Sequence, residues 1–417
     1  MFAGYRRGNR DWIEVGLDMA DALELPKGFE FGFAQAGIKY PNRKDVGLLY
    51  SQKPASCAAV FTKNLFAAAP VHFSRAALEK AAGFVSGVIV NSGCANAATG
   101  SEGDVNAERM AVLAQEGTGA GAPVLVSSTG TIGVQLPMDR LSAGITEAAV
   151  TKAAGAEAFI AFADSIMTTD TVRKVASDSF AVDGKRVAVA GCAKGSGMMH
   201  PNMATMLAYV FTDAEIEPRL LQQIFVRIIE RTLNCVTVDG DTSTNDTAVV
   251  LANGAAEVDI VPDTPAFHGF ETALTNVLKS LAKQLARDGE GATHLVEVTV
   301  NGAPDFFEAR KAALAVANSP LVKTAIYGRD ANWGRIACAL GNSGVEFDAS
   351  KTDISLGGIE LMREGSPVDF SEEKALDVLK RENIEIVADL KAGTESATVW
   401  TCDLTEKYIE INGSYRT

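Results

Sequence analysis

Short apolar runs alternate with amphipathic stretches along most of the chain, a pattern typical of a mixed α/β protein. Residues 87–91 and 123–127 are rich in Val, Ile and Leu and predict buried strands. The apolar run 206–212 predicts a third. Apolar and polar residues alternate over 294–300, which predicts a strand with one buried face, and we expect a similar strand near 398–404.

Helical patterns fall between these strands. Residues 104–117 start with an Asp at the expected cap and end at a Gly, and the Ala-rich residues 146–164 predict a second helix. Pro218 stands at the expected first position of a third helix, and an amphipathic helix is expected over 267–287. Because several strand pairs lack a crossover helix, we predict a layered sheet with some antiparallel pairing.

Composition and charge exclude several classes of protein. The 417 residues are 47% hydrophobic and 22% charged, so the chain can bury a sizeable core and is not mainly disordered. A formal charge of −14 repels polyphosphate, which argues against nucleic-acid and anionic-membrane partners and leaves small molecules. The charge-free stretches are too polar to span a membrane, and the N-terminus lacks an apolar signal core. We therefore expect a cytoplasmic protein.

Several common catalytic motifs are missing from the sequence. The six cysteines lie far apart and form no Cys-x-x-Cys or paired Cys/His spacing, so no zinc site or redox motif is predicted. No phosphate-binding loop, dinucleotide fingerprint or Gly-x-Ser-x-Gly elbow is present. Of the four histidines, none stands in a triad motif, and we expect His200 to be a packed or hydrogen-bonded loop residue.

Four segments hold more Gly, Asn, Ser and Thr than helix or strand packing requires. Each alone is best interpreted as a tight turn. Together they favour an active site built on loops, because binding and catalytic residues concentrate there. The four segments are residues 91–98, 127–133, 194–205 and 238–247.

A nucleophile can act without histidine if its own α-amine becomes the base, which requires the chain to be cut. At Ala204-Thr205 the small preceding side chain leaves room for the threonine hydroxyl to attack the Ala204 carbonyl, and water then completes the cleavage. The freed amine, with a pKa near 8, suits proton transfer at cellular pH. From spacing alone this remains a minority interpretation, because an internal Ala-Thr is usually an ordinary peptide bond.

The segment KGSGMMHPNMATML resembles the self-cleavage signature of the glutamate N-acetyltransferase family, also called ornithine acetyltransferases, of arginine biosynthesis. The resemblance extends from Gly28 to Thr417, whereas residues 1–27 have no counterpart. It is carried, in order along the chain, by FAQAGIKYPNRKDVGLLYSQKPASCAAVFTKN, NSGCANAATG, SSTGTIGVQLP, SIMTTDT, TVDGDTSTNDT, SPLVKTAIYGRDANWGRIACALG and INGSYRT.

This resemblance implies the αββα layered fold of the DmpA/ornithine acetyltransferase type, an N-terminal-nucleophile enzyme. It implies cleavage into an α chain, 1–204, and a β chain, 205–417, that assemble as an α2β2 heterotetramer. Thr205 would accept an acetyl group from N-acetylornithine and pass it to glutamate. Thr129 and Gly130 correspond to the oxyanion pair. No cofactor is implied, and the sequence leaves open whether acetyl-CoA is a second acetyl donor.

The resemblance also identifies residues expected to contact substrate. Lys194 could pair with a substrate carboxylate and Glu290 with an amino end of ornithine, which would give both substrates one binding register. For a lone Lys or Glu a structural ion pair would otherwise be the default. One of two adjacent threonines faces the substrate, and the sequence does not decide which. The expected substrate-binding residues are Thr168, Thr169, Lys194, Thr205, Glu290, Asn412 and Thr417.

Two other functions compete with this one. An amidase or aminopeptidase could use the same N-terminal threonine with water as the acceptor. An uncleaved binding or structural protein could keep the loops without any chemistry. Formation of acetylglutamate in place of free acetate would distinguish the transferase from the amidase or aminopeptidase. Two fragments on a denaturing gel, in place of one full-length band, would distinguish it from the uncleaved protein.

Overall fold

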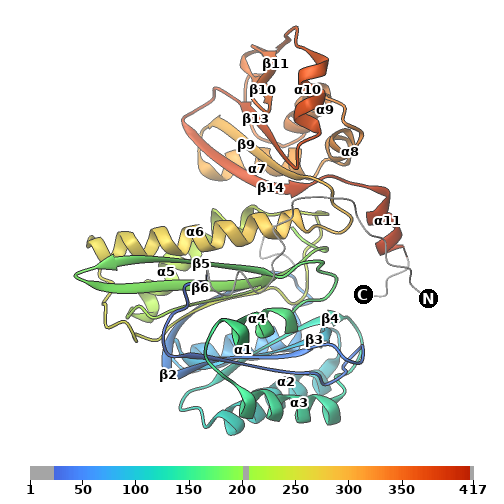
Figure 1. Cartoon of the computed structure of the whole chain (residues 1–417). Helices are drawn as coiled ribbons and strands as arrows, with labels where there is room; N and C mark the ends of the chain where they lie inside the picture. The colour runs from blue at the N-terminus through green and yellow to red at the C-terminus, as the bar shows by residue number, and fades with distance from the viewer. Residues whose placement is uncertain (1–22, 201–205, 414–417) are drawn as a thin grey trace.

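The computed structural model describes residues 23–200 and 206–413, and two mixed β-sheets form its framework (Figure 1). The first sheet has the order β4-β3-β2-β8-β7-β6-β5, with β1 paired to β2. Its strands are β1 (Phe29–Ala34), β2 (Val46–Phe61), β3 (Phe84–Cys94), β4 (Val124–Thr131), β5 (Lys174–Val182), β6 (Lys185–Lys194), β7 (Leu207–Thr212) and β8 (Thr247–Ala252).

The second sheet has the order β12-β11-β10-β13-β9-β14. Its strands are β9 (Leu295–Ala303), β10 (Asp353–Leu356), β11 (Ile359–Arg363), β12 (Ser366–Pro367), β13 (Asn383–Asp389) and β14 (Glu395–Cys402). The helices are α1 (Ala69–Lys80), α2 (Gly100–Thr118), α3 (Met138–Thr151), α4 (Ala156–Ser165), α5 (Pro218–Glu230), α6 (Pro265–Arg287), α7 (Phe306–Ala317), α8 (Pro320–Gly328), α9 (Trp333–Gly341), α10 (Glu372–Leu379) and α11 (Glu406–Asn412).

The long strand β2 divides the first sheet into two halves. Its first part pairs with β3 and its last part with β8, and the pairing is irregular between Tyr50 and Ala55. Apolar residues of β3, such as Val88, and of β8, such as Leu251, belong to one buried core between the halves. Helices α2 and α3 cover the outside of one half, and α5 and α6 cover the other. The predicted αββα layers are therefore present.

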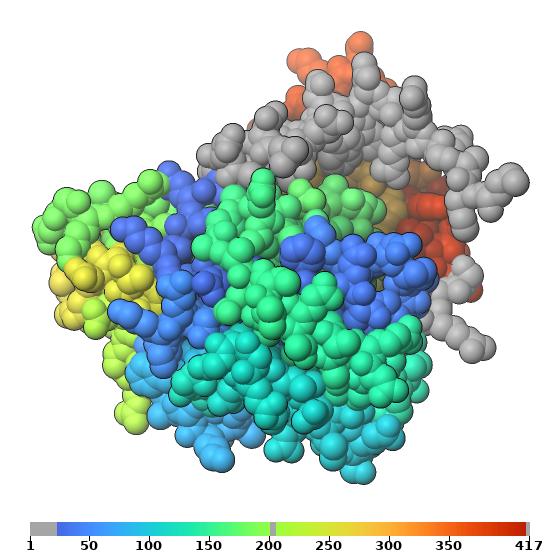
Figure 2. Space-filling model, turned by 60° about the horizontal axis from the view of Figure 1, so that its bottom comes forward, coloured from blue at the N-terminus to red at the C-terminus, as the bar shows by residue number. Residues whose placement is uncertain are grey.

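The layers can be followed in Figures 1 and 2. Helix α6 packs on β5 and β6 and also contacts β9 and β14, so it lies between the first sheet and the lobe that the second sheet forms (Figure 1). Helices α2 and α3 lie on the face shown in Figure 2, where they cover the sheet beneath them. In the described part of the chain, 23–200 and 206–413, every helix is too short or too polar to cross a membrane.

Most of the predicted elements are confirmed, and two helix predictions need correction. The helix predicted over 104–117 begins earlier, after Thr99, so Asp104 is not its cap. It ends at Gly119, whose positive φ of 67° suits glycine. The helix predicted over 146–164 is two helices, α3 and α4. The chain leaves the helix between them because Ala153 pairs with Phe31 of β1 through two backbone hydrogen bonds.

The remaining predictions agree with the structure. Strands β3, β4, β7, β9 and β14 overlap the five predicted strand segments, and every described residue of β7 is buried. Pro218 is the first residue of α5, where Glu217 caps the helix by accepting from the N–H of Leu220. Helix α6 covers the amphipathic segment predicted over 267–287, and its apolar face fills the core next to β5 and β6.

Candidate active site

A cavity of about 80 Å³ opens where β4 and β6 end and where β7 and β8 begin. Lys194, Leu207 and Thr247 lie side by side across three strands at this edge of the sheet. The cavity brings together all the predicted site residues that the structure describes, although they come from five separate segments. These residues are Thr129, Gly130, Thr168, Thr169, Lys194, Glu290 and Asn412. Ala204, Thr205 and Thr417 lie outside the described residues.

The chemistry expected of an oxyanion pair depends on Thr129 and its neighbours. The Nζ of Lys194 donates a hydrogen bond to Thr129 Oγ1 at 3.1 Å, and the two residues are only 3% and 6% exposed. Gly130 has a φ of 133°, and a Cβ there would overlap the backbone of Gly93. Only glycine therefore lets β4 approach β3 so closely at this point.

Lys194 is a buried cation within reach of several charges. Burial lowers the pKa of Lys194 below its ordinary value. The carboxylates of Asp170, Asp246 and Glu290 act in the opposite direction because they stabilise the charged amine, whereas the nearby Lys174 adds to the lowering. The three acidic neighbours therefore offset part of the effect that burial has on the pKa of Lys194.

A fully buried lysine outside the cavity joins the segments that form it. The Nζ of Lys174 lies 2.6 Å from Asp170 Oδ1 and 2.7 Å from Asp288 Oδ2. Asp170 also accepts from the N–H groups of Gly195 and Thr168. Burial opposes ionisation of Asp170, but the charges of Lys174 and Lys194 outweigh it and hold its pKa well below the ordinary value.

Asp288 also contacts two segments of the site, the one before β5 and the one after β6. Its Oδ2 accepts from the N–H of Thr171 at 3.0 Å, and its backbone carbonyl accepts from the hydroxyl of Ser196 at 2.6 Å. The N–H of Glu290 donates to the carbonyl of Ser196. The turn after α6 is thus fixed to the end of β6, and this contact places Glu290 in the cavity.

Helix α11 contributes Asn412 to the wall of the cavity next to Glu290. Asn412 Nδ2 donates to Glu290 Oε2 at 2.8 Å. A Cβ added at Gly197 would meet the Glu290 carboxylate, so glycine at this position leaves the space that the carboxylate occupies. Glu290 is therefore held from two directions at the wall of the cavity.

The turn before β8 supports β4, the strand that carries Thr129 and Gly130. Asn245 Nδ2 donates to the carbonyls of Ala95 at 2.6 Å and Ser128 at 2.9 Å. The next residue, Asp246, is buried, and its Oδ1 accepts from the N–H of Met206 at 3.2 Å. Burial raises the pKa of Asp246 well above its ordinary value. Within the described residues its Oδ2 has no hydrogen-bond partner.

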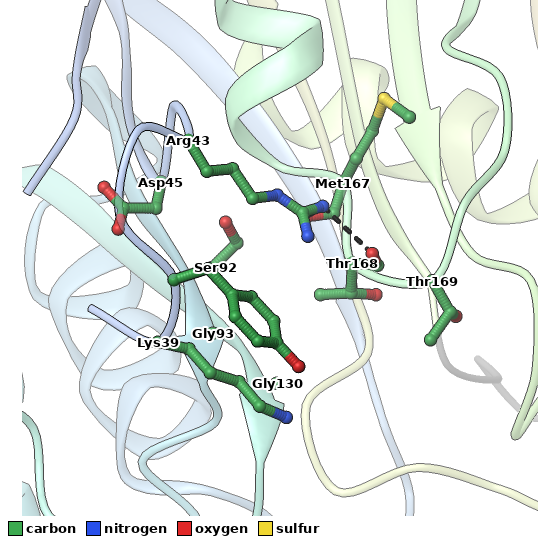
Figure 3. A pocket seen from close by; sticks show the side chains of 10 residues that line it. Lys39, Arg43, Asp45, Ser92, Gly93, Gly130, Met167, Thr168 and Thr169 are labelled. Carbon is green, nitrogen blue, oxygen red and sulfur yellow. Dashed lines mark hydrogen bonds between the residues drawn. The ribbon is translucent and has the colours of Figure 1, made fainter. Parts of the chain in front are cut away.

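A second cavity of about 130 Å³ adjoins the first, and the two share Gly130, Thr168 and Thr169. Figure 3 shows Lys39 and Arg43 entering it from the loop between β1 and β2, opposite the segment that carries Thr168 and Thr169. No functional role was predicted for these two cations from the sequence, although both belong to a segment that carries the family resemblance.

All four predicted loop segments reach the first cavity, and they also supply Ala95, Ile132, Met198, Ser243 and Thr244 to its wall. His200 is a hydrogen-bonded loop residue, as expected: its Nδ1 lies 3.3 Å from both Thr237 Oγ1 and Asn318 Nδ2. Lys174 gave no signal in the sequence, because it stands in no glycine-rich segment. Asp288 stands in the Asp-Gly-Glu-Gly segment that holds Glu290, but no role was predicted for it.

The family model described as the ArgJ family matches residues 30–417 of this chain. The chain is 48% identical over 405 residues to the arginine biosynthesis bifunctional protein ArgJ of Symbiobacterium thermophilum, which covers 96% of this chain and 99% of that protein. It is 45% identical over 399 residues to the protein of the same name from Thermotoga neapolitana, which covers 94% of this chain and 100% of that protein.

The chain also resembles a solved structure. The crystal structure of the arginine biosynthesis bifunctional protein argJ from Bacillus halodurans matches with a TM-score of 0.50 and 47% sequence identity. The match covers 51% of this chain and 100% of that chain.

Proposed function

The chain belongs to the ArgJ family, and on that premise we propose that it transfers the acetyl group of N2-acetylornithine to glutamate through an acetyl ester on Thr205. It is an acyltransferase of arginine biosynthesis. The observation that carries the finer proposal is the cavity that unites the Lys194–Thr129 hydrogen bond, Gly130 and Glu290 beside the strand that follows residue 205.

The proposal begins with cleavage between Ala204 and Thr205, which gives chains 1–204 and 205–417. The threonine hydroxyl attacks the preceding carbonyl, the amide becomes an ester, and water hydrolyses it to free the threonine amine. Strands β7 and β8 would then belong to the second chain while they pair with β6 and β2 of the first. This interleaving would keep the two chains together after the cut.

The match to the Bacillus halodurans structure supports a two-chain mature protein. The whole of that crystallised chain corresponds to about half of this one. A cut ahead of residue 205 would divide the present chain into nearly equal parts. We extend the proposal to an α2β2 assembly of these chains, which the mass of the native protein in solution tests.

In the first half-reaction, the Thr205 hydroxyl attacks the acetyl carbonyl of N2-acetylornithine while the Thr205 α-amine takes the hydroxyl proton. The Thr129 hydroxyl and the Gly130 N–H donate to the negative oxygen of the tetrahedral intermediate. The intermediate collapses when the α-nitrogen of ornithine leaves with the proton held by the Thr205 amine. The products are acetyl-Thr205 and ornithine.

In the second half-reaction, the α-amine of glutamate attacks acetyl-Thr205, and the same two donors stabilise the oxyanion. The Thr205 oxygen leaves and recovers a proton, so the enzyme is restored and N-acetylglutamate is released. The proposed cycle uses no cofactor, and acetyl-CoA would enter it only as an alternative acetyl donor.

The residues of the cavity supply the binding groups that this cycle needs. Lys194 would pair with the α-carboxylate that both substrates carry, and Glu290 would pair with the δ-ammonium of ornithine. Thr168 and Thr169 line the same space. Ile132 and Met198 add apolar surface that would limit the access of water to the acetyl ester.

Two measurements test the proposal. Fragment sequencing of the purified protein should find a new terminus that begins Thr-Met-Leu, with two bands near half of 43.8 kDa on a denaturing gel. Incubation with N2-acetylornithine and glutamate should give ornithine and N-acetylglutamate. A single full-length band, or free acetate in place of N-acetylglutamate, would overturn the proposal in favour of a binding protein or a hydrolase.

A further inference from the structure

The two substrates of the proposed reaction carry opposite charges at the ends of their side chains. Ornithine ends in a δ-ammonium, and glutamate ends in a γ-carboxylate. The first cavity presents the carboxylate of Glu290, which Asn412 holds in place. A γ-carboxylate that followed the path of the ornithine side chain would meet Glu290 as a like charge in a partly buried site. One side-chain position therefore suits ornithine and disfavours glutamate.

The adjoining cavity has the opposite charge. It shares Gly130, Thr168 and Thr169 with the first cavity, and it adds the side chains of Lys39 and Arg43 (Figure 3). Because the shared wall includes the expected oxyanion glycine, a substrate whose reacting atoms lie there can extend in either direction.

Lys39 is held in position by its surroundings. Its Nζ donates to Thr131 Oγ1 at 3.0 Å, one residue beyond Gly130. The buried carboxylate of Asp45 accepts from the N–H of Ala36 at 2.7 Å and of Ile38 at 2.6 Å, and these bonds fix the loop just before Lys39. The half-buried ammonium is thus placed beside β4, the strand that carries Gly130 and Thr131.

Arg43 occupies the other side of the second cavity. Its Nη2 donates to the carbonyls of Met167 at 2.6 Å and Thr168 at 2.9 Å. Among the described residues these are its only hydrogen bonds, so Nε and Nη1 keep N–H groups that a carboxylate can accept. Of the described residues in the wall of this cavity, Asp45 alone is acidic. Its carboxylate is bound to backbone N–H groups and also feels the charge of Arg43.

From this arrangement, which rests on the proposed function, we propose that the cavity of Lys39 and Arg43 binds the γ-carboxylate of glutamate, whereas the δ-ammonium of ornithine lies against Glu290. The α-carbons of the two substrates share one position, and their side chains point into different cavities. A glutamate side chain extends about 4 Å from its α-carbon to its carboxyl carbon, so the binding group has to lie in an adjoining space. The second cavity is such a space.

The experiment uses the Lys39→Gln variant of the full-length, processed protein. Arg43 is a poorer target because it also holds Met167 and Thr168. The first half-reaction is followed as ornithine release in a single turnover with N2-acetylornithine, and the second as acetyl transfer to glutamate and to glutamine. Lys53→Gln removes the same charge from an exposed position on β2 that lines neither cavity.

The expected result is a KM for glutamate that rises about tenfold in Lys39→Gln, a change several times larger than any change in ornithine release. Because glutamine lacks the charge, the preference for glutamate over glutamine should fall by a similar factor. Lys53→Gln should behave like the wild type. Equal effects of Lys39→Gln on both half-reactions, or an unchanged preference for glutamate, would overturn the inference. Absence of ornithine release from the wild type would instead overturn the proposed function.

Discussion

Lys194 donates a hydrogen bond to the hydroxyl oxygen of Thr129 across 3.1 Å, and both side chains are buried. An ammonium group can only donate, so the Thr129 oxygen is the acceptor in this pair. The proton of the Thr129 hydroxyl is therefore left for another acceptor. A hydroxyl oriented in this way is prepared to donate to an oxygen that becomes negative during acyl transfer.

Replacement of Thr129 by Val tests this role, because it removes the hydroxyl and keeps the branched shape. Loss of one oxyanion donor raises the barrier by about 2.7–4 kcal/mol, so we expect kcat to fall about 100- to 1,000-fold with little change in KM. Thr129→Ser keeps the hydroxyl and should retain most of the activity. Steady-state kinetics of the wild type and the two variants measure these effects. A Val variant with near-normal kcat would show that the Thr129 hydroxyl has no part in the mechanism.

Two substitutions of Thr205 test the proposed self-cleavage. Thr205→Ala has no hydroxyl, so we expect an uncut chain without transferase activity. Thr205→Ser keeps the hydroxyl but loses the methyl that orients it, and should be cut partially. Denaturing gels and an assay of N-acetylglutamate measure both outcomes. Activity in the Ala variant would assign the nucleophile elsewhere, and a wholly uncut Ser variant would contradict the proposed shift.

The layers of the fold could be predicted from the sequence because they depend on local periodicity. Helix α6 and strand β7 show this clearly, since their apolar patterns match the faces that they bury. The error over 146–164 has a tertiary cause. Alanine-rich sequence favours helix throughout, but the pairing of Ala153 with Phe31 breaks the helix there, and a single segment does not reveal its partner strand.

The loops around the first cavity could also be predicted from a local feature of the sequence, their composition. Dense Gly, Ser, Asn and Thr mark loops that approach a ligand closely, and all four such segments meet at the first cavity. Lys174 gave no such signal. A lysine within a strand pattern is normally exposed, and its burial depends on Asp170 and on Asp288, which lies more than a hundred residues away.

Lys174→Met tests the importance of this buried cluster. The change leaves Asp170 and Asp288 without a shared cation, and breaking a buried pair costs about 3–5 kcal/mol. We expect a clear fall in the denaturant midpoint of the processed protein. Lys53→Met, at an exposed position, should change the free energy of unfolding by less than about 0.5 kcal/mol. Equal stability of the two variants would show that the cluster contributes little.

Asp246 should make stability depend on pH. The unfolded chain ionises this group near its ordinary pKa of about 3.9, whereas the folded protein keeps the proton to a higher pH. The contribution of Asp246 to stability therefore falls as the pH rises above about 4 toward the raised pKa.

Asp246→Asn tests this pH dependence, because it keeps an oxygen for the N–H of Met206 and cannot ionise. We expect the variant to gain stability relative to the wild type between about pH 4.5 and about pH 7.5, measured by denaturant unfolding at both values. A difference that stays constant with pH would contradict the raised pKa.

Gly197 determines where the Glu290 carboxylate can lie, which gives a test of substrate binding that leaves Glu290 itself intact. A Cβ at position 197 would overlap that carboxylate, and the end of a flexible side chain can move aside without unfolding the protein. We expect Gly197→Ala to shift Glu290 away from the position of the ornithine δ-ammonium. The KM for N2-acetylornithine should rise about tenfold, as for loss of a charge-assisted hydrogen bond, while the melting temperature changes little.

Gly121→Ala places its Cβ in open space and is the matched control. If KM for the donor is unchanged in Gly197→Ala, the ammonium of ornithine does not depend on Glu290 in the position that the structure gives it.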